Sequence, residues 1–227
     1  MSTPRPQHLD WDSIYAQDTP PAYSIGEPQP ELAALIEDGK VRSEVLDAGC
    51  GHAALSLALA ARGYTVVGLD GSGAAVAAAA AAAKERGLHT ASFAQADLTS
   101  FSGFDGRFNT IMDSGLFHVL TPEEGHDYLE CIHRAAAPEA SLFILAFATN
   151  AFADDTPPGP NGFTEDTLHQ AVSAVWEVDE LRPAKLYANE THLQGAGAAI
   201  GAAERDGQGR VKLPGFLLSA RKHPQAR

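Results

Sequence analysis

The sequence is poor in cysteine and in positive charge, and each shortage excludes a class of protein. The two cysteines, Cys50 and Cys131, lie far apart, which excludes a disulfide framework and the closely spaced cysteine pairs of zinc sites. Sixteen Lys and Arg face 29 Asp and Glu, so the formal net charge is −13 and an anionic partner, nucleic acid or membrane, is not expected. Free cysteines of this kind favour a reducing, cytoplasmic setting.

Long apolar runs are scarce as well. The longest run, residues 74–83, is nearly pure alanine and is too short to span a bilayer. The N-terminus lacks the basic and apolar segments of a signal peptide. With 44% apolar side chains in 227 residues, we expect a soluble protein that buries one core.

From residue 31 on, apolar stretches and glycines alternate in the pattern of strands and helices. The expected strands are 44–48, 65–69, 89–94, 108–112 and 141–148, and the expected helices are 31–38, 53–62, 74–86 and 122–136. A helix at 164–175 and short strands at 176–179, 185–188 and 216–219 follow. This order predicts a doubly wound, Rossmann-like α/β fold with a mostly parallel sheet covered on both faces.

Residues 1–30 are set apart by six prolines, which leave room for one short helix between them. Trp11, Ile14 and Tyr15 have helical spacing in that interval. This helix either docks on the domain as a plain surface element or acts as a lid over a binding site. We therefore divide the chain into an N-terminal lid segment, 1–30, and a domain, 31–227.

The most informative motif is a glycine turn that follows an acid. Asp47 closes the first strand, and Gly49 and Gly51 would let the backbone approach a ligand closely. The turn also fits the G-x-G-x-x-A fingerprint of nicotinamide enzymes, with Asp70 about twenty residues on. An NAD(P)-dependent oxidoreductase is therefore one reading.

The acid before the glycine turn and another acid after the third strand indicate a different ligand. Asp47 would oppose a pyrophosphate but suits an ammonium group, and Asp97 with Leu98 after the third strand suits an adenine. A ligand with an amino-acid end, a ribose and an adenine fits all three acids.

This constellation resembles class I S-adenosylmethionine-dependent methyltransferases over nearly the whole chain. The resemblance implies a seven-stranded sheet, S-adenosyl-L-methionine as cofactor and S-adenosyl-L-homocysteine as product. In that family the glycine turn contacts the methionine end, the second acid the ribose and the third acid the adenine. The cofactor contacts implied here are Trp11, Tyr15, Asp47, Gly49, Gly51, Asp70, Gly71, Asp97, Leu98, Asp113 and Ser114.

A narrower resemblance lies in residues 24–36, Ser-Ile-Gly-Glu-Pro-Gln-Pro-Glu-Leu-Ala-Ala-Leu-Ile. This run is similar to the thiopurine-methyltransferase-like branch, and within it to the heterocyclic toxin methyltransferases of mycobacteria. The resemblance implies methylation of a hydroxyl, or another heteroatom, of a small aromatic or heterocyclic molecule such as a hydroxyquinolone or hydroxyquinone, in detoxification. Those relatives carry Pro-Pro-Trp where this chain has Pro20-Pro21-Ala22-Tyr23, so the wall of the acceptor site is expected to differ there.

Acceptor contacts are expected from the lid and from the end of the fourth strand: Tyr15, Tyr23, Phe117 and His118, with Phe152 and Phe163 as further candidates. The segment 113–118 lacks the Asn/Asp-Pro-Pro-Tyr motif common in enzymes that methylate amide or base nitrogens. His118 either takes a proton from the acceptor as a base or only shapes the site.

Three alternatives complete the expectations. His126, Glu130 and His133 share one helix face, but an ordinary solvent face explains them better than a metal site, so no metal is expected. A second alternative is a module that binds the cofactor but does not catalyse methyl transfer. The chain is expected to be a monomer or a homodimer.

Overall fold

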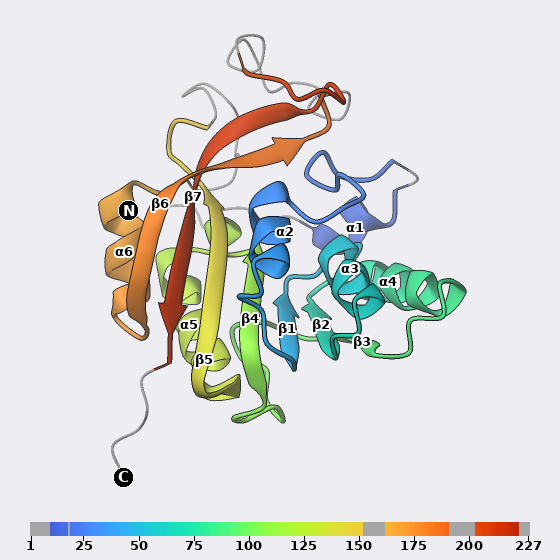
Figure 1. Cartoon of the computed structure of the whole chain (residues 1–227), viewed down its shortest axis with the longest axis horizontal. Coiled ribbons are helices and arrows are strands. Elements are labelled where there is room, and N and C mark those ends of the chain that lie inside the picture. Colours follow the sequence, from blue (N-terminus) through green and yellow to red (C-terminus); the bar gives the residue numbers. More distant parts are fainter. Residues whose placement is uncertain (1–9, 18, 152–161, 191–202, 223–227) are drawn as a thin grey trace, which may run out of the picture.

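The computed structural model describes residues 10–17, 19–151, 162–190 and 203–222, so Phe152 lies outside the described residues. In the described part, seven strands form one sheet in the order β3-β2-β1-β4-β5-β7-β6 (Figure 1). The strands are β1 (Val45–Ala48), β2 (Val66–Asp70), β3 (Ala91–Gln95), β4 (Phe108–Ser114), β5 (Ala136–Phe147), β6 (Glu177–Ala188) and β7 (Val211–Arg221). Strands β1 to β5 are parallel and β7 is antiparallel to both of its neighbours, which confirms the predicted Rossmann-like sheet.

Helices cover both faces of this sheet. They are α1 (Trp11–Tyr15), α2 (Pro30–Glu37), α3 (Ala54–Ala61), α4 (Gly73–Glu85), α5 (Pro122–Ala135) and α6 (Glu165–Ser173), with a 3-10 turn, η1, at Phe117–Val119. Successive strand residues point to opposite faces, so Ile111 of β4 packs with α5 and α6 whereas Met112 packs with α2 and α3. None of the described helices is long and apolar enough to cross a membrane.

Three strands differ from the expectation, and one of them is the predicted short strand 216–219, which is the longer strand β7 from Val211 to Arg221. The predicted strands 176–179 and 185–188 are one strand, β6, which pairs with β7 from Glu177 to Ala188. Pro183 is tolerated within it because β6 is the edge strand of the sheet. Strand β5 was expected to begin at residue 141, but it begins at Ala136, directly after α5. Glu139, in this early part of the strand, has a positive φ of 59°.

The hairpin of β6 and β7 reaches past the carboxyl ends of the parallel strands. Strand β5 pairs with β7 as far as Gly215, whereas β6 continues the pairing to Val211. Figure 1 shows this far part of the hairpin above the sheet, on the side where α1 and the chain leading to α2 lie. The hairpin and the N-terminal segment therefore meet at the carboxyl edge, where the predicted site residues lie.

Candidate active site

Asp47 fastens the helix that follows the glycine turn. Its Oδ2 accepts hydrogen bonds from the Ser56 hydroxyl at 2.6 Å and the Ser56 N–H at 3.1 Å, in the first turn of α3. The N-cap residue of α3, Ala53, has no side-chain acceptor. Asp47 of the preceding strand instead accepts a backbone N–H of the first turn, as an N-cap side chain would. The side chain is 1% exposed, and burial raises the pKa of Asp47 to about 6.

The glycine turn lies against both the N-terminal helix and the loop after β4. Gly49 and Gly51 have φ of 70° and 50°, a conformation that other residues rarely adopt. A Cβ on Gly51 would stand 2.6 Å from the Tyr15 hydroxyl oxygen, and one on Gly49 would stand 2.8 Å from Leu116 Cβ. Only glycine therefore fits at either position without movement of a neighbour.

Asp70, at the end of β2, joins the turn to the start of α4. Its Oδ2 accepts the Gly51 N–H at 2.8 Å and its Oδ1 accepts the Ser72 N–H at 2.9 Å. Burial raises the pKa of the Asp70 carboxyl, against these two hydrogen bonds, which lower it. A carboxylate has about four acceptor positions, so Asp70 keeps capacity for two more donors, as a ligand diol would supply.

The N-terminal helix α1 is fastened next to Asp70. Asp12 Oδ1 accepts hydrogen bonds from the Ser72 hydroxyl and the Ala74 N–H, both at 2.9 Å, and so caps α4 from outside that helix. This role of Asp12 was not predicted from the sequence, because the helix that it caps begins some sixty residues later in the chain. That α1 acts as a lid stays a prediction.

Aromatic side chains gather where α1 meets the glycine turn. The Tyr15 ring lies edge-on to His52 with 5.0 Å between centroids, and Trp11 lies 6.3 Å from Tyr15 and 6.4 Å from Tyr23. Burial raises the pKa of both the Tyr15 and the Tyr23 hydroxyl. The structure thus brings together three of the predicted ligand contacts, and Tyr23 is 39% exposed.

The third acid organises its own turn after β3. Asp97 accepts hydrogen bonds from the Thr99 N–H and hydroxyl and from the Ser100 hydroxyl, and the Thr99 bonds hold the pKa of Asp97 below its usual value. Leu98, which we expected to hold an adenine together with Asp97, is 6% exposed and packs in the core. That it contacts the cofactor stays a prediction.

Asp113 holds the loop after β4. Its carboxylate accepts hydrogen bonds from the N–H groups of Gly115, Leu116 and Phe117 at 3.0, 2.7 and 3.1 Å, and from the Tyr128 hydroxyl at 2.9 Å. It is fully buried, and burial raises the pKa of Asp113 to about 7. We expected this side chain to contact a cofactor, but in the structure it anchors the loop instead, and Ser114 beside it is half-buried.

In the loop after β4, the side chains of Phe117 and His118 are both buried and do not form an open wall of the site. Phe117 is 3% exposed and stacks on Phe163 with 5.1 Å between ring centroids. The His118 ring packs 4.6 Å from that of Phe147, and its Nδ1 accepts the Phe147 N–H at 3.3 Å. Burial lowers the pKa of His118 to about 3, so the ring is neutral and its proton is on Nε2.

The remaining predicted residues lie at the same edge or outside the site. Gly71 follows Asp70 and its carbonyl accepts a hydrogen bond from the Gln95 side chain at 2.9 Å. His126 pairs with Glu130 on the surface, and His133 packs against Trp176. Across the described ranges, no group of three His, Cys, Asp or Glu side chains is placed to hold a metal ion.

Together these residues form a site in which buried carboxyl groups lie at the same edge as aromatic rings, of which Tyr23 is exposed. Asp47, Asp70 and Asp113 lie at the last or the second-last residue of three adjacent strands of the sheet and are all buried. Such an arrangement favours a ligand that carries positive charge and hydroxyl groups.

Comparison with known proteins gives this site a family context. Residues 45–139 match a family model described as a methyltransferase domain. The 2-heptyl-1-hydroxyquinolin-4(1H)-one methyltransferase of Mycobacteroides abscessus is 45% identical over 219 residues, which cover 93% of this chain and 96% of that protein.

Solved structures agree with this context. A protein from a study of the conversion of a disulfide bond into a thioacetal group during echinomycin biosynthesis is 27% identical, with a TM-score of 0.80 over 95% of this chain and 92% of its own. The Burkholderia thailandensis 1,6-didemethyltoxoflavin-N1-methyltransferase, solved with its substrate and S-adenosylhomocysteine, has a TM-score of 0.60 over 86% of this chain and 77% of its own. At 21% identity it shows the shared fold alone.

Proposed function

Because the chain belongs to the class I S-adenosylmethionine-dependent methyltransferases, we propose that it methylates a hydroxyl, or another heteroatom, of a small aromatic heterocycle. The observation that carries the proposal is the cluster of Trp11, Tyr15 and Tyr23 that lies on the glycine turn. The 45% identity to a hydroxyquinolone methyltransferase supports a hydroxyquinolone or hydroxyquinone as acceptor. Because the chain belongs to a methyltransferase family, we no longer propose an NAD(P)-dependent oxidoreductase.

The residues at the carboxyl edge fit the cofactor. Asp70 keeps free acceptor positions for the two ribose hydroxyls, and Gly49 and Gly51 give the turn a backbone conformation that other residues rarely adopt. The carboxylates of Asp47 and Asp70 supply negative charge that favours a cationic cofactor. When bound, S-adenosylmethionine supplies an electrophilic methyl group on a positively charged sulfur.

The chain itself contributes alignment and the exclusion of water. Tyr15 and Tyr23 present apolar rings with polar tips, which suit a flat acceptor that also carries a hydroxyl. The Asp12 contacts to α4 and the packing of the Tyr15 ring against Gly51 and His52 hold α1 in place before a ligand arrives. Preorganisation of this kind contributes to rate by fixing the acceptor oxygen in line with the methyl group.

We propose that His118 orients the acceptor and does not take its proton. The Nδ1 atom is occupied by the Phe147 N–H, and the Nε2 atom already carries the ring proton. His118 can therefore donate a hydrogen bond through Nε2. An acidic N-hydroxy or phenol-like hydroxyl is partly ionised near neutral pH and needs no strong base.

The pH dependence of turnover tests this role. Because the pKa of His118 is lowered to about 3, the ring is neutral across pH 5–9, and kcat is expected to rise with pH through the pKa of the acceptor. Measurement of kcat against pH with two acceptors of different acidity is expected to give two inflections that follow the acceptors. An inflection near 6.5 that is shared by both acceptors and lost in His118→Gln would show that His118 acts as the base.

A panel of acceptors tests the proposed function. The purified protein is incubated with S-adenosylmethionine and hydroxyquinolones, hydroxyquinones, aryl thiols and halides, and S-adenosylhomocysteine is quantified. We expect turnover with the aromatic hydroxyl acceptors. Stabilisation by S-adenosylhomocysteine in a melting experiment without turnover on any acceptor would favour the non-catalytic binding module.

The setting of the reaction is also a proposal. The acidic chain, with Cys50 and Cys131 free and buried, suits a reducing cytoplasm, where methylation of a toxic heterocycle would remove an ionisable hydroxyl. Neither nucleic acid nor membrane is proposed as a partner, and a monomer or a homodimer remains the expected state.

A further inference from the structure

The segment that carries Tyr23, residues 19–30, is attached along the free edge of β6, and we call it the strap. Gln29 of the strap is 6% exposed, and its side-chain amide pairs with the backbone of Tyr187 in both directions. Gln29 Nε2 donates to the Tyr187 carbonyl at 2.9 Å, and the Tyr187 N–H donates to Gln29 Oε1 at 2.8 Å. An edge strand has unpaired backbone groups, and Gln29 satisfies two of them in place of another strand.

A second attachment surrounds Tyr23 itself. The Asn189 N–H donates to the Ala22 carbonyl at 2.7 Å, and the Asn189 side-chain amide donates to the Ser24 carbonyl at 3.1 Å. These two hydrogen bonds fall on the residues immediately before and after Tyr23. Asn189, just beyond the end of β6, therefore fixes the backbone from which the Tyr23 ring projects.

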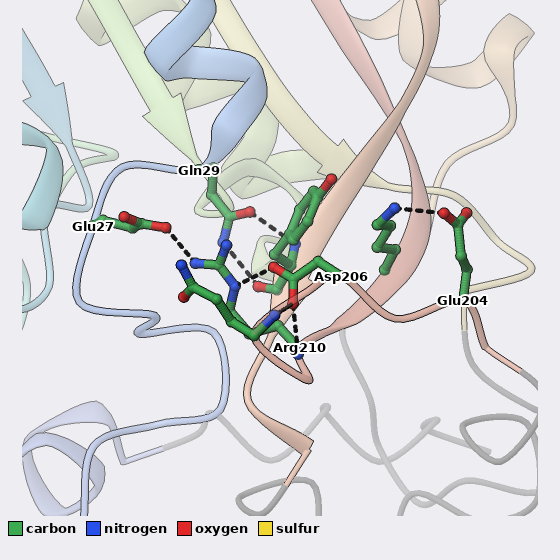
Figure 2. Close-up of polar contacts among 8 residues, drawn as sticks. Glu27, Gln29, Glu204, Asp206 and Arg210 are labelled. Atoms are coloured by element: carbon green, nitrogen blue, oxygen red, sulfur yellow. Dashed lines mark hydrogen bonds and ion pairs between the residues drawn. The ribbon is translucent and has the colours of Figure 1, made fainter.

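A third attachment comes from the start of β7. The Arg210 side chain is 11% exposed, forms ion pairs with Asp206 and with Glu27 of the strap, and has its guanidinium 5.4 Å from the centroid of the Tyr187 ring. Figure 2 shows Glu27 and Gln29 reaching from the strap toward the hairpin, with Arg210 between Glu27 and Asp206. Because Arg210 is largely buried, this network is expected to be firmer than a surface ion pair.

We propose that the β6–β7 hairpin sets acceptor selectivity, with Asn189 and Arg210 as positioning residues that act through Tyr23 of the strap. The proposal rests on the proposed function, in which Tyr23 contacts a flat aromatic acceptor. Tyr23 lies against Trp11, Trp11 lies against Tyr15, and Tyr15 lies on Gly51. A shift of the strap would thus move the aromatic wall relative to the turn that holds the cofactor.

The test compares Asn189→Ala and Arg210→Ala with a matched control on the same hairpin. Lys212→Ala is the control because Lys212 pairs with Glu204 of the hairpin region and its ion pair does not involve the strap. For each variant, kcat/KM is measured with an unsubstituted 1-hydroxyquinolin-4-one and with its 2-heptyl derivative, together with the Kd for S-adenosylhomocysteine. Arg210→Lys, which keeps the charge but not the planar fork, serves as the conservative variant.

We expect each alanine variant to change the ratio of the two kcat/KM values about tenfold, through KM. The reason is the loss of a hydrogen bond or ion pair that holds the strap, and with it Tyr23, in position. The cofactor Kd and the Lys212→Ala ratio are expected to stay within about twofold of wild type, and Arg210→Lys to lie between. Partial unfolding lowers both rates equally and leaves their ratio unchanged. An unchanged ratio in both folded alanine variants would overturn the proposal.

Hydrogen exchange gives a readout that does not need turnover. Loss of the Asn189 side chain is expected to speed exchange of the amides at 22–26 at least about fivefold, with no change in α4. If the wild-type protein methylates no acceptor, the proposed function fails, while faster strap exchange would still support the positioning role. Exchange in Asn189→Ala equal to that of Lys212→Ala would contradict that role.

Discussion

Asp70→Ala is expected to weaken binding of S-adenosylhomocysteine by at least about a hundredfold. The change removes the acceptor of two ribose hydroxyls, and each hydrogen bond to a charged group contributes roughly 1.5–3 kcal/mol. Two such bonds give about 3–6 kcal/mol, and 1.4 kcal/mol is a factor of about ten in Kd. The variant also leaves the Gly51 and Ser72 N–H groups without their present partner, which disturbs the turn on which the cofactor lies.

Calorimetric titration with S-adenosylhomocysteine measures this effect, and two variants control it. Asp70→Asn keeps the shape of the side chain and one carbonyl acceptor, so its loss of affinity is expected to be smaller. Asp105→Ala removes a carboxylate that pairs with Arg134 and leaves the described site residues unchanged, so it tests the effect of net charge alone. Affinity of Asp70→Ala within threefold of wild type would remove Asp70 from the ribose site.

Asp113→Ala is expected to lower the free energy of unfolding by about 3–5 kcal/mol, whereas Asp113→Asn is expected to preserve the fold. Alanine leaves the N–H groups of Gly115, Leu116 and Phe117 and the Tyr128 hydroxyl without an acceptor in a buried position. Each orphaned buried group costs roughly 1–3 kcal/mol, reduced where water enters. Asparagine keeps an acceptor oxygen and nearly the same volume.

The pH dependence of this pair has a defined sign. The folded pKa of Asp113, about 7, lies above its ordinary value of 3.8, so folding favours the protonated form. This contribution is fully present below pH 3.8 and is lost as pH rises through 7. The stability of the wild type relative to Asp113→Asn is therefore expected to fall by up to about 4 kcal/mol between pH 4 and pH 8.

Denaturant unfolding of the three proteins at several pH values measures both effects. Because wild type and Asp113→Asn differ at one group, the shared titrations of other carboxyls cancel in the comparison. A pH-independent difference would show that Asp113 is ionised at an ordinary pKa in the folded protein. Equal stability of the alanine and wild-type proteins would show that the loop does not depend on this carboxylate.

The parallel part of the fold follows from the sequence because its signals are local. The strands that contain Asp47 and Asp70 are short apolar runs with an acid at or next to their last residue, and glycines follow the helices that come after them. The antiparallel part is harder to predict. Pro183 divides β6 in the sequence, and only its place at the edge of the sheet, a tertiary property, makes a continuous strand possible.

The candidate site divides in the same way. The positions of Asp47, Gly51 and Asp70 could be predicted because strand, turn and helix follow one another directly. The structural role of Asp113 could not, since one of its four partners is Tyr128 on α5 and three are backbone groups of a folded loop.

The depth of individual side chains could not be predicted either. Leu98 and Phe117 were expected to face a ligand, but both are buried in the core beneath the site. An apolar residue next to a strand end can point toward the core or toward a ligand, and only the packing of α5 and the loop decides which.

Transfer of a labelled methyl group is the direct test of the proposed methyltransferase activity. The purified protein is incubated with S-adenosylmethionine that carries a trideuteromethyl group on sulfur and with 2-heptyl-1-hydroxyquinolin-4(1H)-one, and the products are analysed by mass spectrometry. We expect one equivalent of S-adenosylhomocysteine for each quinolone that gains an intact trideuteromethyl group on its hydroxyl oxygen, and little product with Asp70→Ala. If both ligands are shown to bind and the quinolone stays unlabelled, the proposed activity is contradicted.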